Sequence, residues 1–86
     1  MNSLNLTIIS PERCLYEGEA DRVTLPGTVG SFTILPSHAP ILSSLKAGRV
    51  TYATASGERS VEIEAGFVEM SRNRVTVCVE IKNGVK

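Results

Sequence analysis

Apolar and polar residues alternate with a period of two along much of this 86-residue chain. Because successive side chains of a β-strand point to opposite faces, this pattern predicts strands with one buried and one solvent-facing side. The positions expected to face inward are Leu4, Leu6 and Ile8; Val23 and Leu25; Val50, Tyr52 and Thr54; Val61, Ile63, Ala65 and Phe67; and Val75, Val77, Val79 and Ile81. Gly66, inside the fourth of these segments, predicts a bend or a β-bulge there.

Turn-forming residues separate the alternating segments at short intervals. Ser56-Gly57-Glu58 and Ser71-Arg72-Asn73 are typical of hairpin loops. No stretch repeats apolar residues at helical spacing, and the nearest candidate, residues 41–45, is too short for a helix. The sequence therefore predicts an all-β fold, an antiparallel β-sandwich or flattened barrel of about eight to ten short strands. We expect one domain over residues 1–86, with a polar tail after Glu80, residues 81–86, that frays.

The segment from Leu25 to Pro40 contains three of the four prolines and the only histidine. Each proline fixes φ and removes a backbone donor, and the residue before each is driven to an extended conformation. Gly27, after Pro26, fits the third position of a type II turn, where φ is positive. We therefore expect a stiff surface loop, a short buried strand, and a second stiff loop that holds His38 between two prolines. The inward residues of that short strand are expected to be Phe32 and Ile34.

Composition and charge exclude several classes of protein. Charged residues make up 21% of the chain and hydrophobic residues 42%, which is typical of a folded domain and not of a disordered chain. Nine basic residues balance nine acidic ones without a run of like charge, and aromatic residues are scarce, so we expect no nucleic-acid partner. The apolar runs are too short to span a membrane, and the amino terminus lacks the regions of a signal peptide. We therefore expect an intracellular protein.

Groups that could perform catalysis are few. Cys14 and Cys78 are expected to be small buried hydrophobes rather than a disulfide, and neither has metal-ligand spacing. A dyad of either cysteine with His38 is conceivable, but a thiol within an apolar strand such as that of Cys78 is inert. A single histidine also excludes the metal motifs that need two.

Two other candidate sites favour a structural interpretation. Glu62 and Glu64 share one strand face and, with Glu69, are typical of a solvated surface rather than of a catalytic acid pair. Residues 26–30 superficially resemble a phosphate-binding loop, but the following Lys-Ser/Thr and a helix N-terminus are missing. We therefore predict a protein that is not an enzyme and takes no cofactor, no metal and no small-molecule substrate.

His38 leaves two interpretations open. Its ring either binds a backbone group and locks the loop, or contacts a partner protein beside the apolar pair Ile41 and Leu42. That apolar pair is explained almost equally well by core packing and by an interface.

Several motifs of this chain occur together in one known family. They are Leu-x-Ile-Ile-Ser-Pro at 6–11, Tyr16-x-Gly18, Val-Thr-Leu-Pro-Gly-x-x-Gly at 23–30, Ile-Leu-Pro-x-His-Ala-Pro-Ile-Leu at 34–42, Leu-x-x-Gly at 45–48, Gly-Phe-Val-Glu-Met at 66–70 and Asn-Arg-Val-Thr-Val at 73–77. Over nearly its whole length the chain thus resembles the N-terminal β-domain of epsilon subunits of F-type ATP synthase. The Leu-Pro-x-His-Ala-Pro block, following the Pro-Gly-x-x-Gly loop, is the specific part of this signal.

The resemblance implies a ten-stranded β-sandwich at the foot of the rotating central stalk. Members of this family join the gamma subunit to the ring of membrane c subunits, so that proton or sodium-ion movement is coupled to ATP synthesis. They have no catalytic role and meet the catalytic alpha/beta hexamer only indirectly. The implied location is peripheral, on the cytoplasmic face of the bacterial plasma membrane.

The resemblance also implies two contact segments. The c-ring contact is expected at Gly27, Thr28, Val29, Gly30 and Ser31, and the gamma contact at His38, Ala39, Pro40, Ile41 and Leu42.

Two departures from the family pattern are visible. Relatives commonly carry an acidic residue where this chain has Ser31, so a charge contact with the c ring is expected to be missing. Most relatives also continue into a C-terminal helical hairpin, so we expect either a naturally short epsilon chain or an isolated N-terminal domain that couples rotation but does not inhibit ATP hydrolysis. The alternative function is a small β-barrel protein–protein adaptor module without enzymatic activity.

Overall fold

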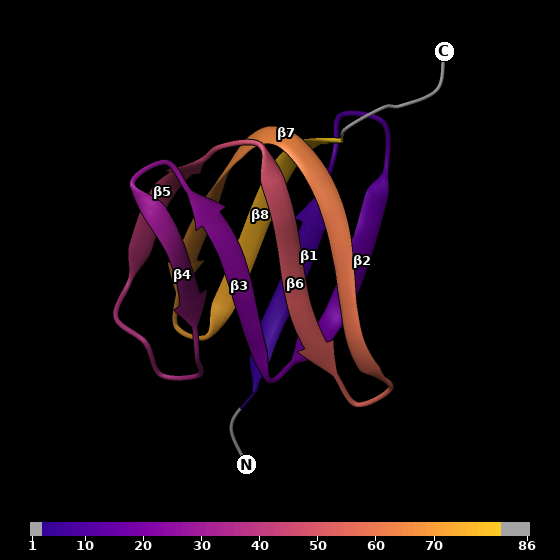
Figure 1. Ribbon diagram of the computed structural model, residues 1–86. Coiled ribbons are helices and arrows are strands. Elements are labelled where there is room, and N and C mark those ends of the chain that lie inside the picture. The colour runs from indigo at the N-terminus through magenta and orange to yellow at the C-terminus, as the bar shows by residue number, and fades with distance from the viewer. Residues whose placement is uncertain (1–2, 82–86) are drawn as a thin grey trace.

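The computed structural model describes residues 3–81, which form eight strands and, within that range, no helix (Figure 1). This confirms the all-β prediction, with fewer strands than the ten that the resemblance implies. The strands are β1 (Leu4–Ile9), β2 (Cys14–Ala20), β3 (Arg22–Gly27), β4 (Gly30–Ile34), β5 (Ile41–Leu45), β6 (Gly48–Thr54), β7 (Gly57–Ser71) and β8 (Arg74–Ile81). Of the tail predicted to fray, Ile81 instead ends strand β8, and the rest lies outside the described residues.

The strands form one continuous sheet that closes into two layers. Its order is β2-β1-β8-β7-β5-β3-β4, and β6 pairs with both β3 and β7. The 15-residue strand β7 passes from one layer to the other, because its first half pairs with β6 and its second half with β5 and β8 (Figure 1). One pair departs from the antiparallel prediction: β1 runs parallel to β8. These two strands come from opposite ends of the chain, so no short turn forces them to be antiparallel.

The core lies between the two layers and consists of the inward side chains of the alternating segments. The predicted inward positions are confirmed in β1 and β3, in β6 for Val50 and Tyr52, and in β8 for its three valines, while Ile81 is half-buried against the core. The fully buried large side chains are Leu4, Leu6, Ile8, Val23, Leu25, Ile34, Val50, Ile63, Val68, Met70, Val75 and Val77. Phe32 is half-buried and packs against this core.

Strand β7 departs from the predicted alternation after Ile63. A register shift between Ile63 and Ala65 inserts one extra residue, and a shift of one residue moves every following side chain to the other face. Phe67, predicted to face inward, is therefore 48% exposed, while Val68 and Met70 are buried. Gly66 follows the bulge, and a Cβ atom there would collide with the carbonyl oxygen of Cys78 on β8. The predicted bulge is thus present, but its effect on Phe67 was not foreseen.

The turns show which loop predictions hold. Both predicted hairpins are present, and at 72–73 the turn residues Arg72 and Asn73 have positive φ. The other turn lies at 55–56, slightly before the predicted loop, because Gly57 and Glu58 already belong to β7. The type II turn predicted at Gly27 is wrong, because Pro26 and Gly27 continue strand β3 and the turn is formed by residues 28–29. Positive φ is found instead at Gly30 (143°). Gly27 is needed for another reason, since a Cβ there would lie 2.6 Å from the carbonyl oxygen of Gly30.

Residues 41–45 form strand β5, not a helix. Within residues 3–81, no helix is long and apolar enough to cross a membrane.

Candidate protein-interaction sites

The two segments that sequence reasoning singled out lie at opposite ends of the sandwich. The turn at 28–29 precedes β4, and the loop at 35–40 follows it, so the length of that strand separates them. In Figure 1 the β3–β4 turn is at the top, and the loop that leads from β4 to β5 is at the bottom. The structure therefore offers two separate candidate surfaces rather than one combined site.

The first surface, which we call the tip, comprises residues 27–31. Val29 at its apex is fully exposed and Ser31 is exposed, whereas Gly27 is buried. Thr28 points back to strand β5: its hydroxyl lies 3.0 Å from that of Ser44, and its N–H donates to the Ser44 carbonyl at 3.2 Å. A third bond, from Lys46 N–H to the carbonyl of Pro26 at 2.9 Å, holds the base of the tip. The tip is therefore braced before any partner binds, which lowers the entropic cost of association.

The second surface includes the loop at 35–40. Ser37 has a φ of 70°, and its N–H donates to the side-chain oxygen of Asn73 in the β7–β8 turn at 2.6 Å. His38 N–H donates to the carbonyl of Leu35 at 3.2 Å, and His38 Nδ1 lies 2.8 Å from the Ala39 carbonyl. The ring thus binds a backbone group, as the first interpretation of His38 expected. The side chain nevertheless stays exposed, so a contact role remains a prediction.

Ile41 and Leu42 take different places, although they were predicted as a pair. Ile41 is half-buried and packs against the core. Leu42 is 78% exposed on the outer face of β5, opposite Glu69 of β7. Of the two interpretations, core packing therefore fits Ile41, and only Leu42 presents a large free apolar side chain.

Sequence reasoning missed an apolar hollow on the outer face of β1, β7 and β8. Its volume is about 390 Å³, and its lining includes Ile9, Pro11, Phe67 and Cys78. Phe67 reaches this face only because of the bulge in β7. The sequence did contain a sign of this arrangement. After Gly66, Val68 and Met70 alternate in the opposite phase to Val61 and Ile63, so they compete with Phe67 for the inward face.

The cysteines are not the buried hydrophobes that were expected. Cys14 is exposed and Cys78 half-buried, and both are free thiols. They flank Ile9 on neighbouring strands, since Ile9 pairs with Cys14 of β2 on one side and Cys78 of β8 on the other. Two strand spacings, about 9–10 Å, are too long for a disulfide.

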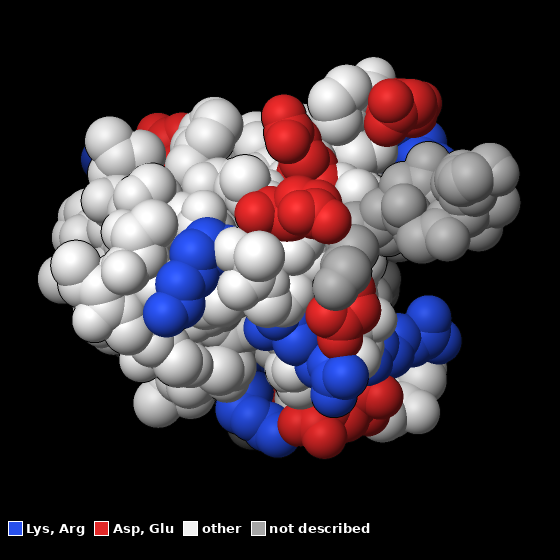
Figure 2. Space-filling model, turned by 45° about the horizontal axis from the view of Figure 1, so that its top comes forward, with Lys and Arg blue, Asp and Glu red and all other residues white. Residues whose placement is uncertain are grey.

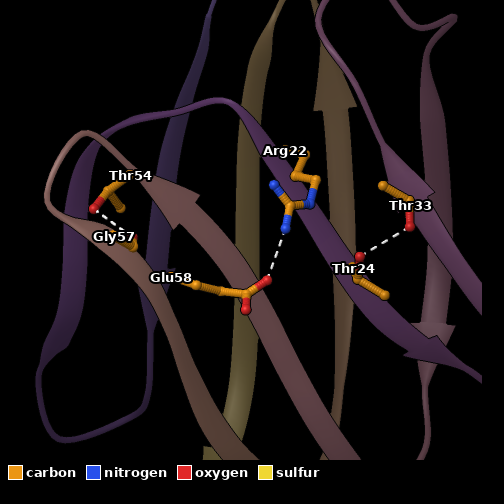
Figure 3. A network of polar contacts seen from close by, with 6 residues as sticks. All are labelled: Arg22, Thr24, Thr33, Thr54, Gly57 and Glu58. Carbon is orange, nitrogen blue, oxygen red and sulfur yellow. Dashed lines mark hydrogen bonds and ion pairs between the residues drawn. The ribbon is translucent and has the colours of Figure 1, made fainter.

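Two of the acidic residues, Glu58 and Glu62, form ion pairs on exposed faces of the sandwich. Arg49 Nε binds Glu62 at 2.6 Å, and Arg22 binds Glu58 at 2.7 Å beside the Thr24–Thr33 hydroxyl pair (Figure 3). Exposed pairs of this kind contribute about 0–1 kcal/mol to stability. No group of three or more His, Cys, Asp or Glu side chains suited to a metal ion occurs within residues 3–81.

One titratable group is shifted by its surroundings. Burial raises the pKa of the Tyr52 phenol, the nearby Arg59 opposes this shift, and Tyr16 adds to it. The rings of Tyr16 and Tyr52 lie 4.8 Å apart at an angle of 43° and connect β2 to β6 across the sandwich. The shifted group therefore belongs to the packing of the domain rather than to the tip or the loop.

Comparison with known proteins agrees with this architecture. Residues 3–82 match the model of the ATP synthase delta/epsilon chain β-sandwich domain. The chain is 37% identical over 79 residues to the ATP synthase epsilon chain of Leptospira borgpetersenii, covering 92% of this chain and 62% of the relative. It is 34% identical over 80 residues to the epsilon chain of Caulobacter vibrioides, covering 93% of each.

A solved structure shares the fold. A chain of the Euglena gracilis mitochondrial ATP synthase, determined with OSCP, F1 and c-ring, superimposes with a TM-score of 0.85 at 16% identity, covering 92% of this chain and 51% of that one. The sequence match over nearly the whole chain and this common fold together show that the chain belongs to the ATP synthase delta/epsilon β-sandwich family.

Proposed function

We propose that the chain acts as one β-sandwich domain in the central stalk of an F-type ATP synthase, where it joins the gamma subunit to the c ring. It has no catalytic role of its own. Its work is to make the ring and gamma turn together, so that proton or sodium-ion flow drives ATP synthesis in the alpha/beta hexamer. It is peripheral to the membrane, on the cytoplasmic side of a bacterium.

One combination of observations carries this proposal. The chain matches the family, and its two exposed segments are both held by hydrogen bonds to the same β-sandwich. A coupling subunit must transmit torque, so its contact segments must keep a fixed position relative to each other. The tip is tied to β5 by Thr28, and β5 carries Leu42. We assign the c-ring contact to residues 27–31, with Val29 as the apolar group that is buried on assembly, and the gamma contact to residues 38–42.

The test is reconstitution of the chain with epsilon-depleted ATP synthase in membrane vesicles. ATP-driven ion pumping is expected to recover with the unchanged chain. Val29→Asp is expected to weaken coupling to the c ring, and Leu42→Asp to weaken binding of gamma, because each places a charge at an apolar contact. Ala55→Asp, in an exposed turn outside both segments, is the matched control.

Circular dichroism separates loss of contact from loss of fold, and recovery of pumping with both Asp variants would contradict the site assignment. A pull-down from solubilised membranes tests the function independently of these residues. Recovery of unrelated proteins, without gamma or c subunits, would mean that the chain is an adaptor rather than a rotor subunit.

A further inference from the structure

A long part of the chain carries no formal charge. The 23 residues from Val23 to Leu45 contain no Asp, Glu, Lys or Arg, although 21% of the whole chain is charged. They form nearly all of β3, all of β4 and β5, and the tip and loop between them. The side of the molecule that carries β4 and β5, on the left in Figures 1 and 2, is accordingly almost free of charged side chains.

Strand β4 has an open edge within this uncharged region. Among the described residues it pairs with β3 alone. Pro26 of β3 has no N–H, and its carbonyl faces away from β4 to accept from Lys46. Its partner Ser31 therefore lies at a non-hydrogen-bonded position, and by alternation Thr33 does too. Ser31 and Thr33, both exposed, direct their backbone N–H and C=O groups outward.

The β4 edge lacks the devices that keep strand edges from pairing. Its register with β3 is continuous over five residue pairs, and it contains no charge, proline or bulge. The opposite edge strand, β2, is protected: it carries Glu17 and Glu19, has a register irregularity, and packs through Tyr16 onto Tyr52. Features that hinder pairing with another strand are therefore present at the β2 edge and absent at the β4 edge.

Exposed apolar side chains stand at both ends of the open edge. Val29 precedes β4 and Leu35 follows it, and they are two of the four large hydrophobic side chains exposed among residues 3–81. An extended segment laid along β4 would contact both. A charged segment would lose hydration here without meeting a countercharge.

We propose that the β4 edge accepts an extended, uncharged segment of a partner polypeptide as an additional strand, held by the backbone of Ser31 and Thr33 and by apolar contacts to Val29 and Leu35. A second copy of this chain fits less well. A five-residue edge buries less than the roughly 1,200 Å² that stable association of free proteins needs. When a partner is already bound elsewhere on the molecule, one of its segments is held close to β4, so the small area of this edge is enough for it to bind. This site shares Val29 and Ser31 with the proposed c-ring contact, but the test below uses the chain alone and its outcome does not depend on the rotor assignment.

The test uses a capped peptide that copies residues 29–35, with a solubilising tail, and amide hydrogen exchange of the full chain followed by NMR. Exchange of the Ser31 and Thr33 amides is expected to slow at least tenfold at saturating peptide. A matched peptide with Glu and Lys in place of its Ser and Thr is expected to give less than a twofold change.

Two variants separate the backbone contact from the side chain. Thr33→Pro removes the outward N–H without touching the ladder to β3 and is expected to abolish binding. Thr33→Val removes only the hydroxyl that meets Thr24 and is expected to bind normally.

Three outcomes would overturn the proposal. They are slow exchange of Ser31 and Thr33 in the free chain, peptide-induced protection located elsewhere such as around Phe67, and protection that rises with chain concentration alone, which would make a second copy the occupant. If Thr33→Pro fails to fold, the amide exchange rates of the unchanged chain with and without peptide still test the proposal.

Discussion

Asn73 links two parts of the molecule that are far apart in the sequence. It occupies the turn between β7 and β8 with a φ of 63°, a conformation that Asn tolerates better than most residues. Its side-chain oxygen accepts the N–H of Ser37, 36 positions away. The sequence predicted the turn from local chemistry, but not this bond, because nothing local specifies which loop packs against the turn.

Two substitutions at Asn73 separate its two roles. Asn73→Gly keeps the positive φ but removes the bond to Ser37, and is expected to lower the free energy of unfolding by about 1 kcal/mol. Asn73→Ala also strains the turn, and is expected to cost about 1 kcal/mol more. Urea unfolding measures both, and an Ala variant as stable as the Gly variant would show that the turn adapts without strain.

Tyr52 makes the stability of the folded domain depend on pH in the alkaline range. Burial raises the pKa of its phenol above the ordinary 10.0. Above pH 10 the unfolded chain releases this proton before the folded chain does, so the unfolded state binds fewer protons and stability falls as pH rises. We expect the urea midpoint to fall between pH 9 and 11, and to fall less in Tyr52→Phe. Equal falls in the two proteins would assign the effect to other groups.

At the scale of a single strand, β7 shows how well the alternation of apolar and polar residues predicts which side chains face the core. Its first half follows the predicted pattern, with Ile63 inward, and β1, β3 and β8 follow it throughout. The second half does not, because the position of a bulge is set by the neighbouring strand as well as by the glycine that marks it. Gly66 lies against the backbone of Cys78 and Val79 on β8, a contact that cannot be seen in β7 alone. The alternation of Val68 and Met70 hinted at the outward position of Phe67, but without the contact to β8 it could not fix where the bulge lies, so the apolar hollow was not predicted.

Gly66→Ala tests this account of the bulge. The added methyl group would meet backbone atoms of β8, which cannot rotate away, so we expect a loss of stability of about 1–3 kcal/mol or more. Ser60→Ala, at an exposed position on the same strand, is expected to stay within about 0.5 kcal/mol of the unchanged protein. Thermal and urea unfolding compare the two variants. A Gly66→Ala protein of normal stability would show that β7 and β8 can separate locally.

At the scale of the whole molecule, the positions of the two candidate surfaces follow from topology rather than from any residue. Both segments were found in the sequence by their prolines, glycines and histidine, and the family resemblance supplied their expected roles. Their placement at opposite ends of the sandwich depends on β4 lying between them. The braces that stiffen them, from Thr28 to Ser44 and from Ser37 to Asn73, join residues 16 and 36 positions apart. Hydrogen bonds between residues so far apart in the sequence cannot be predicted until the packing of the strands is known.

The uncharged character of the tip leads to a prediction about how the proposed stalk is held to the ring. With Ser31 in place of an acidic residue and Val29 fully exposed, the contact should be apolar, and salt screens charges but not apolar burial. Binding of the chain with gamma to c ring in lipid nanodiscs is expected to change less than threefold between 50 and 300 mM salt. Val29→Ala should weaken it about tenfold, because roughly two methylene equivalents of buried surface are lost. Ser31→Glu should restore a salt dependence if basic groups of the ring face this position. Strong salt dependence of the unchanged protein would instead place the ring contact on a charged surface away from the tip.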